Sequence, residues 1–193
     1  MKRITNDTLS IIFERIDDLL KERDTVNIAI DGNSGVGKST LANLIGEKFD
    51  SNIFHMDDFF LTPNLKTEER LNEVGGNVDY VRFNDEVISG IKSKETFKYQ
   101  LYNCKKLELD DIVVIQPKRL NIIEGSYSMH STLIKNYDLK IFLQINELEQ
   151  IERILKRNGP VMLQKFINEW IPKENIYFEK MRIKEKADLI FNI

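Results

Sequence analysis

The sequence predicts an α/β protein built on a doubly wound parallel sheet, with a helical lid and a small β-hairpin insertion. Two observations favour this fold class: strand-like and helix-like segments alternate along the chain, and polar motifs directly follow several of the strands. The 193 residues, 41% of them hydrophobic, suffice for one sizeable core, so we expect a single domain over residues 1–193. In such sheets ligands bind at the carboxyl ends of the strands, and we expect the site there.

The first half of the chain begins with a helix and then alternates between strand and helix. Over residues 7–22, Leu, Ile and Phe recur at helical spacing with charged residues on the opposite face, which predicts an amphipathic helix. At residues 26–30, Val and Ile alternate with smaller or polar residues, which predicts a short buried strand. A helix is expected at residues 38–49 and a second strand at residues 52–56.

Residues 61–110 leave this alternation, and we expect them to form an excursion from the sheet. Their first part, residues 62–77, is polar and contains Pro63 and the pair Gly75-Gly76, which favours a mobile segment. The elements expected within the excursion are a short helix at 68–72, a helix at 81–91, and the strands of a small hairpin at 97–102 and 112–115.

The second half returns to the alternating pattern. Residues 120–123 and 140–145 are rich in apolar residues, as is typical of the central strands of a parallel sheet. Residues 147–186 have helical periodicity and are expected to form the lid. The remaining expected features are breaks at Gly159-Pro160 and at Pro172, and a last strand at residues 187–193.

Composition argues against several classes of protein. The formal net charge is −3 and the pI is near 5.6, so we expect no broad attraction to nucleic acid or to an anionic membrane. No apolar run approaches the roughly 20 residues of a membrane span, and acidic residues interrupt the N-terminal segment where a signal peptide needs an apolar core. The single cysteine, Cys104, excludes an internal disulfide and a cysteine-based metal site. A cytoplasmic protein is expected.

The clearest motif lies between the first expected strand and the helix that follows it. The segment is Gly32-Asn33-Ser34-Gly35-Val36-Gly37-Lys38-Ser39, which satisfies the P-loop pattern G-x-x-x-x-G-K-[ST]. The glycines let backbone N–H groups point at phosphate oxygens, and the helix N-terminus adds partial positive charge. Lys38 can reach the β- and γ-phosphates, and the Ser39 hydroxyl can bind Mg²⁺. These residues, with Thr40 in the first turn of the helix, form the expected ATP-binding segment.

Two acidic residues indicate which kind of nucleotide-binding protein this is. No Asn-Lys-x-Asp element follows the P-loop, which argues against a GTPase, and the chain has no room for the extra domains of a motor. Asp57, in the pair Asp57-Asp58 after the second strand, can accept a proton from an acceptor hydroxyl, although such pairs also occur in solvated turns. Glu124 ends an apolar strand and can hold a water of the Mg²⁺ shell, or can merely cap the strand. A kinase is the favoured hypothesis.

These motifs occur in the order found in uridine kinases, and the chain resembles that family from about residue 27 to residue 193. The segments that carry the resemblance are Ile28-Ala29-Ile30-Asp31-Gly32 with the P-loop, Met56-Asp57-Asp58-Phe59-Phe60, Ile123-Glu124-Gly125-Ser126-Tyr127, residues 137–143 and residues 187–190. The resemblance implies a P-loop NTPase fold, ATP and Mg²⁺ as cofactors, and a small-molecule acceptor. The same superfamily contains pantothenate kinases and phosphoribulokinases, so the acceptor is less well defined than the fold.

The resemblance also implies roles for individual residues around the phosphate site. Asp57 matches the base that accepts the proton of the acceptor hydroxyl, and Phe59 takes one of the aromatic positions beside it, where we expect contact with substrate. Ser39 and Glu124 match the magnesium ligands.

Two further residues match positions that contact the acceptor in uridine kinases. Asp79 corresponds to an aspartate that holds the ribose hydroxyls, and Tyr102 to an aromatic residue of the hairpin. The chain departs from the family just afterwards, because residues 103–107 contain no histidine where the family often has one that contacts the pyrimidine. Asp79 could otherwise be an ordinary loop carboxylate, and Tyr102 a packed strand residue.

Arginines in the expected lid complete the set of candidate catalytic residues. Arg153 and Arg157 lie four residues apart on an expected helix and so share a face. In kinases of this architecture such arginines close over the transferring phosphoryl group and stabilise its charge. The alternative is a solvated basic face that includes Lys156.

The leading hypothesis is transfer of the γ-phosphoryl group of ATP to the 5′-hydroxyl of uridine or cytidine, with residues 61–110 binding the acceptor. The nearest rival is a kinase of the same fold that acts on pantothenate or a sugar-like alcohol, and the third is a regulatory P-loop NTPase. We expect a small-molecule acceptor and neither nucleic acid nor membrane as a partner. The last strand leaves a sheet edge that could serve a homo-oligomer or be covered by the first helix.

Overall fold

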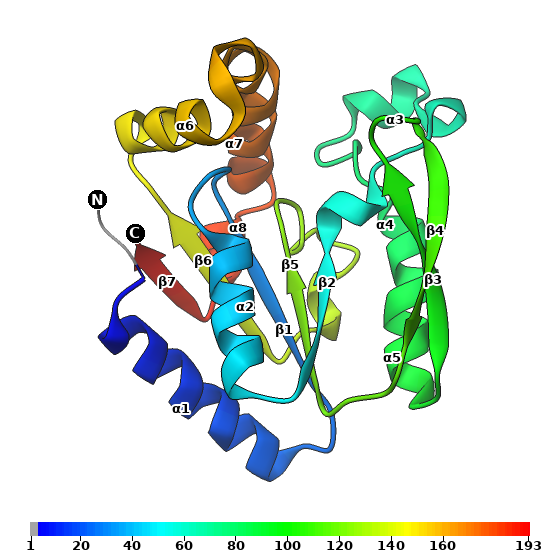
Figure 1. Ribbon diagram of the computed structural model, residues 1–193, viewed down its shortest axis with the longest axis vertical. Coiled ribbons are helices and arrows are strands. Elements are labelled where there is room, and N and C mark those ends of the chain that lie inside the picture. Colours follow the sequence, from blue (N-terminus) through cyan, green and yellow to red (C-terminus); the bar gives the residue numbers. More distant parts are fainter. Residues whose placement is uncertain (1–3) are drawn as a thin grey trace.

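The computed structural model describes residues 4–193 and shows a five-stranded parallel sheet with helices on both faces (Figure 1). Its strands are β1 (Val26–Gly32), β2 (Ser51–His55), β5 (Leu120–Glu124), β6 (Leu139–Gln144) and β7 (Leu189–Asn192). Their order is β2-β5-β1-β6-β7, and every neighbouring pair is parallel. The prediction of a doubly wound α/β sheet is confirmed.

The register of the parallel strands aligns the carboxyl ends of β1, β2, β5 and β6. Glu124, the last residue of β5, pairs with Ile30 of β1 on one side and with His55 of β2 on the other. Gly32, the last residue of β1, pairs with Leu143 of β6. The segments that leave these strands therefore begin side by side at one edge of the sheet.

Both faces of the sheet are buried, because successive strand residues point to opposite faces and both sets are apolar. Helices α1 (Asn6–Glu22) and α2 (Lys38–Lys48) cover one face. The buried cluster on this face includes Ile12, Ile16, Leu41, Ala42, Ile45, Val26, Ile28, Ile30, Leu120, Ile122, Leu139 and Ile141. A second cluster, on the other face, includes Phe54, Ile123 and Phe142 of the strands with Tyr177 and Phe178 of the C-terminal helices.

The excursion that follows β2 contains short helices and a separate hairpin. They are η1 (Met56–Phe59), η2 (Pro63–Leu65), α3 (Glu68–Asn72), α4 (Tyr80–Phe83), η3 (Asn84–Ile88), α5 (Ser89–Ser93), β3 (Phe97–Asn103) and β4 (Glu108–Ile115). The predicted helix at 68–72 is confirmed. Strand β4 begins at Glu108 rather than at residue 112, because the pairing resumes after an irregularity between Gln100 and Tyr102. The sequence did not predict these first residues of β4, because several of them are charged and charged residues are uncommon in strands.

The C-terminal region is helical, as predicted, but one of its two expected breaks is wrong. Its helices are α6 (Glu147–Lys165), η5 (Phe166–Trp170), α7 (Ile171–Lys180) and α8 (Ile183–Lys186). Gly159 has φ 78° and breaks α6 as expected. Pro172 does not break the run, because it lies in the first turn of α7, where its missing N–H costs least. The chain breaks instead at Arg182, which has φ 52°.

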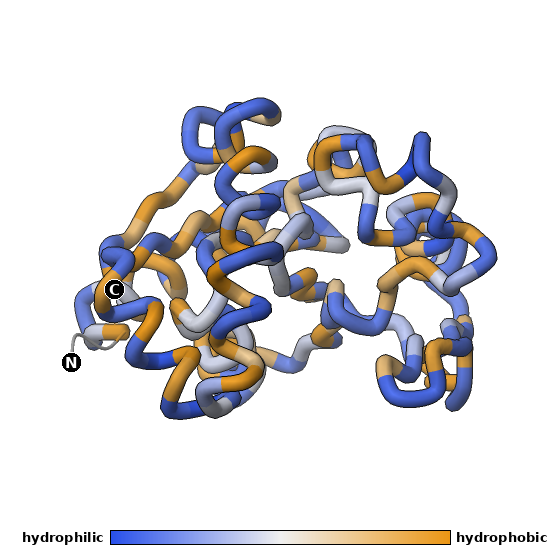
Figure 2. The backbone as a smooth tube through the Cα atoms, turned by 90° about the horizontal axis from the view of Figure 1, so that it is seen from above, coloured by the Kyte–Doolittle hydropathy of each residue, from blue (hydrophilic) through white to orange (hydrophobic). Residues whose placement is uncertain are grey.

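Figure 1 shows α6 and α7 together on one side of the carboxyl ends of the strands, with α3 and the hairpin on the other side. Seen from above in Figure 2, the helices alternate between hydrophilic and hydrophobic residues, as expected of elements with one buried face. Side chains of α1 and β7, such as Leu9 and Phe191, belong to one apolar cluster, so the first helix packs next to the last strand. Within residues 4–193, no helix combines the length and apolar character needed to cross a membrane.

Candidate active site

The loop between β1 and α2 has the backbone shape that an anion site requires. Gly32 has φ 142°, and a Cβ atom there would lie 2.0 Å from the carbonyl oxygen of Leu143, so only glycine fits. Gly37 has φ 109° and caps α2, which begins at Lys38. The partial positive charge of the α2 N-terminus is thus presented at the loop. Thr40 is exposed in the first turn of α2.

The ammonium group of Lys38 is held inside this loop. It donates hydrogen bonds to the carbonyl oxygens of Gly32 (2.8 Å) and Asn33 (3.1 Å). It also donates to Oγ of Ser126, which follows β5, at 3.3 Å. The lysine therefore connects the P-loop to the neighbouring strand end, at the position where a cation can face a phosphate.

Two oxygen donors lie together next to the lysine. The Ser39 hydroxyl donates a 2.9 Å hydrogen bond to Oε1 of Glu124, which is buried at the end of β5. A hydroxyl and a carboxylate are hard ligands of the kind that Mg²⁺ prefers, so this pair fits a magnesium site. His55 Nδ1 lies 2.5 Å from the same carboxylate oxygen, and this contact raises the pKa of His55.

Asp57 follows β2 in η1 and faces the same region. Its side chain is exposed to solvent, yet the surrounding protein desolvates its carboxyl group and raises its pKa. The charge of Lys38 opposes this rise, and that of Glu124 adds to it. The carboxyl group of Asp57 is therefore close enough to Lys38 and to Glu124 for their charges to act on it.

The other member of the acidic pair, Asp58, has a different environment. It accepts a hydrogen bond from the Tyr99 hydroxyl of the hairpin, and burial raises its pKa. It also lines a cavity of about 400 Å³ with hairpin residues that include Tyr102 and Cys104. The two adjacent carboxyl groups therefore belong to different surroundings.

Asp31, just before the P-loop, is fully buried and ties the loop to α7. Its carboxylate accepts hydrogen bonds from the N–H groups of Gly32 (2.7 Å) and Met129 (2.9 Å) and from the Tyr177 hydroxyl (2.7 Å). Burial raises the pKa of Asp31 to about 6. These contacts indicate that Asp31 orients the loop.

The structure places Arg153 and Arg157 of α6 in different surroundings. Arg153 donates hydrogen bonds to the carbonyl oxygen of Val36 (3.1 Å) and to Glu149 (2.6 Å), so it lies directly on the P-loop. Arg157 is exposed and bonds to Asn158, yet it is near enough for its charge to lower the pKa of Asp57. The break at Gly159 follows immediately.

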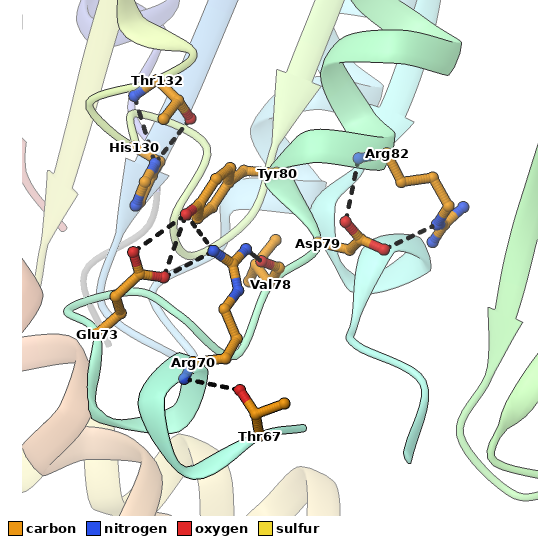
Figure 3. Close-up of polar contacts among 9 residues, drawn as sticks. All are labelled: Thr67, Arg70, Glu73, Val78, Asp79, Tyr80, Arg82, His130 and Thr132. Carbon is orange, nitrogen blue, oxygen red and sulfur yellow. Dashed lines mark hydrogen bonds and ion pairs between the residues drawn. The ribbon is translucent and has the colours of Figure 1, made fainter. Parts of the chain in front are cut away.

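Asp79, the expected ribose contact, is engaged within the protein (Figure 3). Its carboxylate caps α4 by accepting a 3.0 Å hydrogen bond from the backbone N–H of Arg82, and its other oxygen lies 3.6 Å from Nε of Arg82. The Arg82 guanidinium also donates to the carbonyl oxygens of Asp58 (2.8 Å) and Gln100 (2.7 Å). Arg82 thus connects α4, η1 and the hairpin.

The polar segment that was expected to be mobile has its own set of contacts, also drawn in Figure 3. Arg70 of α3 donates to the Tyr80 hydroxyl, to Glu73 and to the carbonyl oxygen of Val78 (3.0 Å). The Tyr80 ring stacks on His130 with centroids 4.3 Å apart. Burial lowers the pKa of His130 to about 4, so the ring is neutral near pH 7.

The two aromatic residues expected to contact the acceptor differ in accessibility. Phe59 is completely buried, with its ring 4.8 Å from that of Phe83 and beneath the Arg82 guanidinium, so it supports the site from within the core and does not line it. Tyr102 lines the cavity beside Asp58, and its buried hydroxyl has no hydrogen-bond partner among the described residues. Of the two side chains, Tyr102 is the one that lines a cavity.

Sequence reasoning missed two polar residues of α6 and α7 that contact the P-loop. Glu174 of α7 accepts a 3.0 Å hydrogen bond from the N–H of Ser34, and Gln150 of α6 donates to the carbonyl oxygen of the same serine at 3.0 Å. Both side chains are buried. The signal for Glu174 was its position among Trp170, Tyr177 and Phe178, where a carboxylate interrupts an apolar helix face.

The fold has close structural relatives among solved proteins. A possible uridine kinase from Bacillus stearothermophilus superposes with a TM-score of 0.67 at 22% identity, over 94% of this chain and 99% of that one. A protein described as a candidate fructose transport system kinase from Silicibacter sp. TM1040 superposes with a TM-score of 0.72 at 21% identity, over 95% and 98% of the two chains. At these identities the similarity establishes the fold alone. No curated protein matches the chain.

The family itself follows from the sequence of the region that builds the site. Residues 27–158 match the model of the phosphoribulokinase / uridine kinase family. This range contains the P-loop, Asp57, Glu124 and both lid arginines, and it covers more than half of the chain. The chain therefore belongs to the phosphoribulokinase / uridine kinase family of P-loop kinases, whose members use ATP and typically Mg²⁺.

Proposed function

We propose that this protein transfers the γ-phosphoryl group of ATP to a hydroxyl group of a small molecule, and that the 5′-hydroxyl of uridine or cytidine is the leading acceptor. The observation that carries the proposal is the convergence of Asp57 with Lys38 and Glu124 at adjacent strand ends. A carboxylate in that position can accept the proton of an acceptor hydroxyl.

The P-loop side binds the triphosphate. The loop N–H groups and the α2 N-terminus face the phosphates, and Lys38 exchanges a hydrogen bond to the protein for one to the β- or γ-phosphate. Ser39 and Glu124 are the residues that would hold Mg²⁺, which supplies charge neutralisation at the phosphate oxygens when bound. Arg153 and Arg157 add positive charge from the lid.

Asp57 acts on the acceptor. It accepts the proton of the acceptor hydroxyl as that oxygen forms a bond to the γ-phosphorus and the bond to the β-phosphate oxygen breaks, which leaves ADP. The charge of Lys38 favours the ionised form of Asp57, which is the form that can accept a proton. Tyr102 contacts the acceptor from the hairpin side, where it lines the cavity beside Asp58.

A second candidate acceptor is pantothenate or a sugar-like alcohol. The observation in its favour is the engagement of Asp79, because both carboxylate oxygens already lie next to Arg82. To hold the two hydroxyls of a ribose, Asp79 must loosen its contact with the guanidinium. An acceptor that does not need this carboxylate would leave the pair intact.

The test is ADP formation from Mg·ATP with uridine, cytidine, pantothenate and a set of sugars as acceptors. We expect uridine or cytidine to give the highest kcat/KM. A higher value for pantothenate or a sugar would replace the nucleoside by that acceptor, and ATP consumption without stimulation by any acceptor would overturn the kinase assignment in favour of a regulatory NTPase.

A further inference from the structure

The carboxylate of Glu174 lies against the phosphate site, although it belongs to neither the P-loop nor the family motifs named above. Glu174 is 3% exposed and lies on α7. It accepts hydrogen bonds from the Ser34 N–H (3.0 Å), from the Ser34 hydroxyl, and from the Ser126 hydroxyl (2.7 Å). One side chain of the lid thus joins the P-loop to the segment that follows β5.

The chemistry of the groups gives these bonds a direction. A carboxylate only accepts hydrogen bonds, and a serine hydroxyl has one proton to donate. Ser126 therefore donates a hydrogen bond to Glu174, and its oxygen accepts a hydrogen bond from the ammonium group of Lys38, 3.3 Å away. The result is a polarised chain from Lys38 through Ser126 to Glu174.

Helix α7 contacts the P-loop region at a second point. Tyr177, three residues after Glu174 and on the same helix face, donates to Asp31, which lies three residues before Ser34. Two matching contacts, one at each end of a helical turn, fix how α7 lies against the loop. The position of Glu174 is therefore set by the packing of the helix as well as by its own hydrogen bonds.

A negative charge beside the phosphate site does not favour the binding of ATP, because like charges repel across a short distance. The benefit of Glu174 must lie in orientation. We propose that Glu174 is a positioning residue: through Ser126 it sets the direction in which Lys38 presents its ammonium group, and through Ser34 it holds the P-loop against the lid. This inference rests on the proposed kinase function.

The main test is Glu174→Gln, which keeps the size of the side chain and removes its charge and part of its accepting capacity. We expect kcat to fall by roughly 10- to 100-fold, the usual consequence of a misplaced reacting group. The Kd for Mg·ATP should be unchanged or lower, because a repelling charge is lost. If no acceptor of the panel is used, the same comparison is made on the slow transfer to water. Glu179→Gln, at an exposed position of the same helix, is the matched control and should change neither value.

A second variant tests the route through the serine. Ser126→Ala should lower kcat by a similar factor, and the double variant Ser126→Ala/Glu174→Gln should be no more than about threefold worse than either single variant, because both remove one connected interaction. Multiplied effects in the double variant would overturn the polarised chain. A purely structural role of Glu174 predicts instead that the Tm falls and the Kd for Mg·ATP rises together.

The outcomes separate this inference from the function on which it rests. If the natural protein binds no Mg·ATP, the proposed function fails and the inference fails with it. If the natural protein binds and uses ATP while Glu174→Gln retains kcat within about twofold, only the positioning role is wrong.

Discussion

The proposed nucleotide side of the site is made mainly from one continuous segment, residues 32–39, whereas the proposed acceptor side is assembled from three separate elements. On the nucleotide side, Lys38 and Ser39 bond to loop carbonyl groups and to Glu124. On the acceptor side, η1, α4 and the hairpin are connected through the guanidinium group of Arg82. The first arrangement depends on local backbone geometry, and the second on contacts between separate elements.

This difference explains why the phosphate chemistry of the chain is better defined than its acceptor. A P-loop keeps its form wherever a strand, a glycine-rich turn and a helix follow one another. An acceptor site of this kind changes whenever the hairpin or α4 shifts, because Asp79 and Tyr102 come from different elements. The predictions below test each side in turn.

The largest effect should come from Lys38→Ala, which breaks the nucleotide side. Removing the cation from the β/γ-phosphate site should abolish measurable phosphoryl transfer, a loss of roughly 10³-fold or more, with the fold intact. Transfer is measured as acceptor-dependent ADP release, and folding by circular dichroism. Lys48→Ala, at an exposed position of the same helix, is the control. Near-normal turnover of Lys38→Ala would refute the P-loop assignment.

Asp57→Asn acts where the two sides meet. It should lower kcat by roughly 10²–10⁴-fold, the usual contribution of a positioned base, and leave the Kd for Mg·ATP nearly unchanged. Asp58→Asn is the matched comparison, because Asp58 has a similar charge and different surroundings. A large loss in Asp58→Asn with little effect in Asp57→Asn would show that the other carboxylate is the base.

The pH profile provides a separate test of the same residue. Because desolvation raises the pKa of Asp57 above its ordinary value of 3.8, the ionised form is lost at a higher pH than for an exposed carboxylate. The kcat/KM for the acceptor should therefore fall as the pH decreases, with a midpoint above 3.8, and should be constant above that limb. The residual activity of Asp57→Asn should lack the limb. An identical limb in the variant would assign it to another group.

The variant Asp79→Asn tests whether this carboxylate contacts the acceptor. If Asp79 holds the ribose hydroxyls, the natural protein should prefer uridine to 2′-deoxyuridine by roughly 10- to 100-fold, the cost of one unpaired polar group. The asparagine can still cap α4, so the preference should fall without a large loss of stability. The measurement is kcat/KM for both nucleosides. An unchanged preference would remove Asp79 from the acceptor site.

The smallest effect concerns stability beneath the P-loop. The pKa of Asp31 is about 6 in the folded protein, above its ordinary value of 3.8, so the folded state binds this proton more tightly. The contribution of Asp31 to the free energy of unfolding is therefore fully present below about pH 4 and is lost as the pH rises through about 6, by no more than about 3 kcal/mol. Urea unfolding of the natural protein and of Asp31→Asn at pH 4 and pH 7 measures it. Equal pH dependence in both proteins would contradict the assignment.

Much of the fold followed from patterns within short stretches of sequence. The strands around residues 26–30, 120–123 and 140–145 were identified because buried parallel strands are apolar throughout. The start of β4 was not identified, because its charged residues lack the usual strand composition. Pro172 suggested a break in the helical region, but α7 accommodates this proline in its first turn. Pairing with β3 decided where β4 begins, and the position of Pro172 in the first turn of α7 decided that the helix continues.

The candidate site divides in the same way. The structure brings together Lys38, Ser39, Asp57 and Glu124, as expected from the ends of adjacent strands, and their roles stay predictions until the variants are measured. It places Phe59 in the core and pairs Asp79 with Arg82, three residues further along the chain.

The sequence by itself determined the P-loop, the family and the parallel sheet, because glycine-dependent turns and apolar strands are properties of a few neighbouring residues. Only the tertiary structure decided which polar groups complete the site. Glu174 meets Ser34 across 140 residues of chain, and Arg82 meets Asp58 across 24. Such contacts depend on how helices and loops pack against the sheet, and the local pattern around either residue does not contain that information.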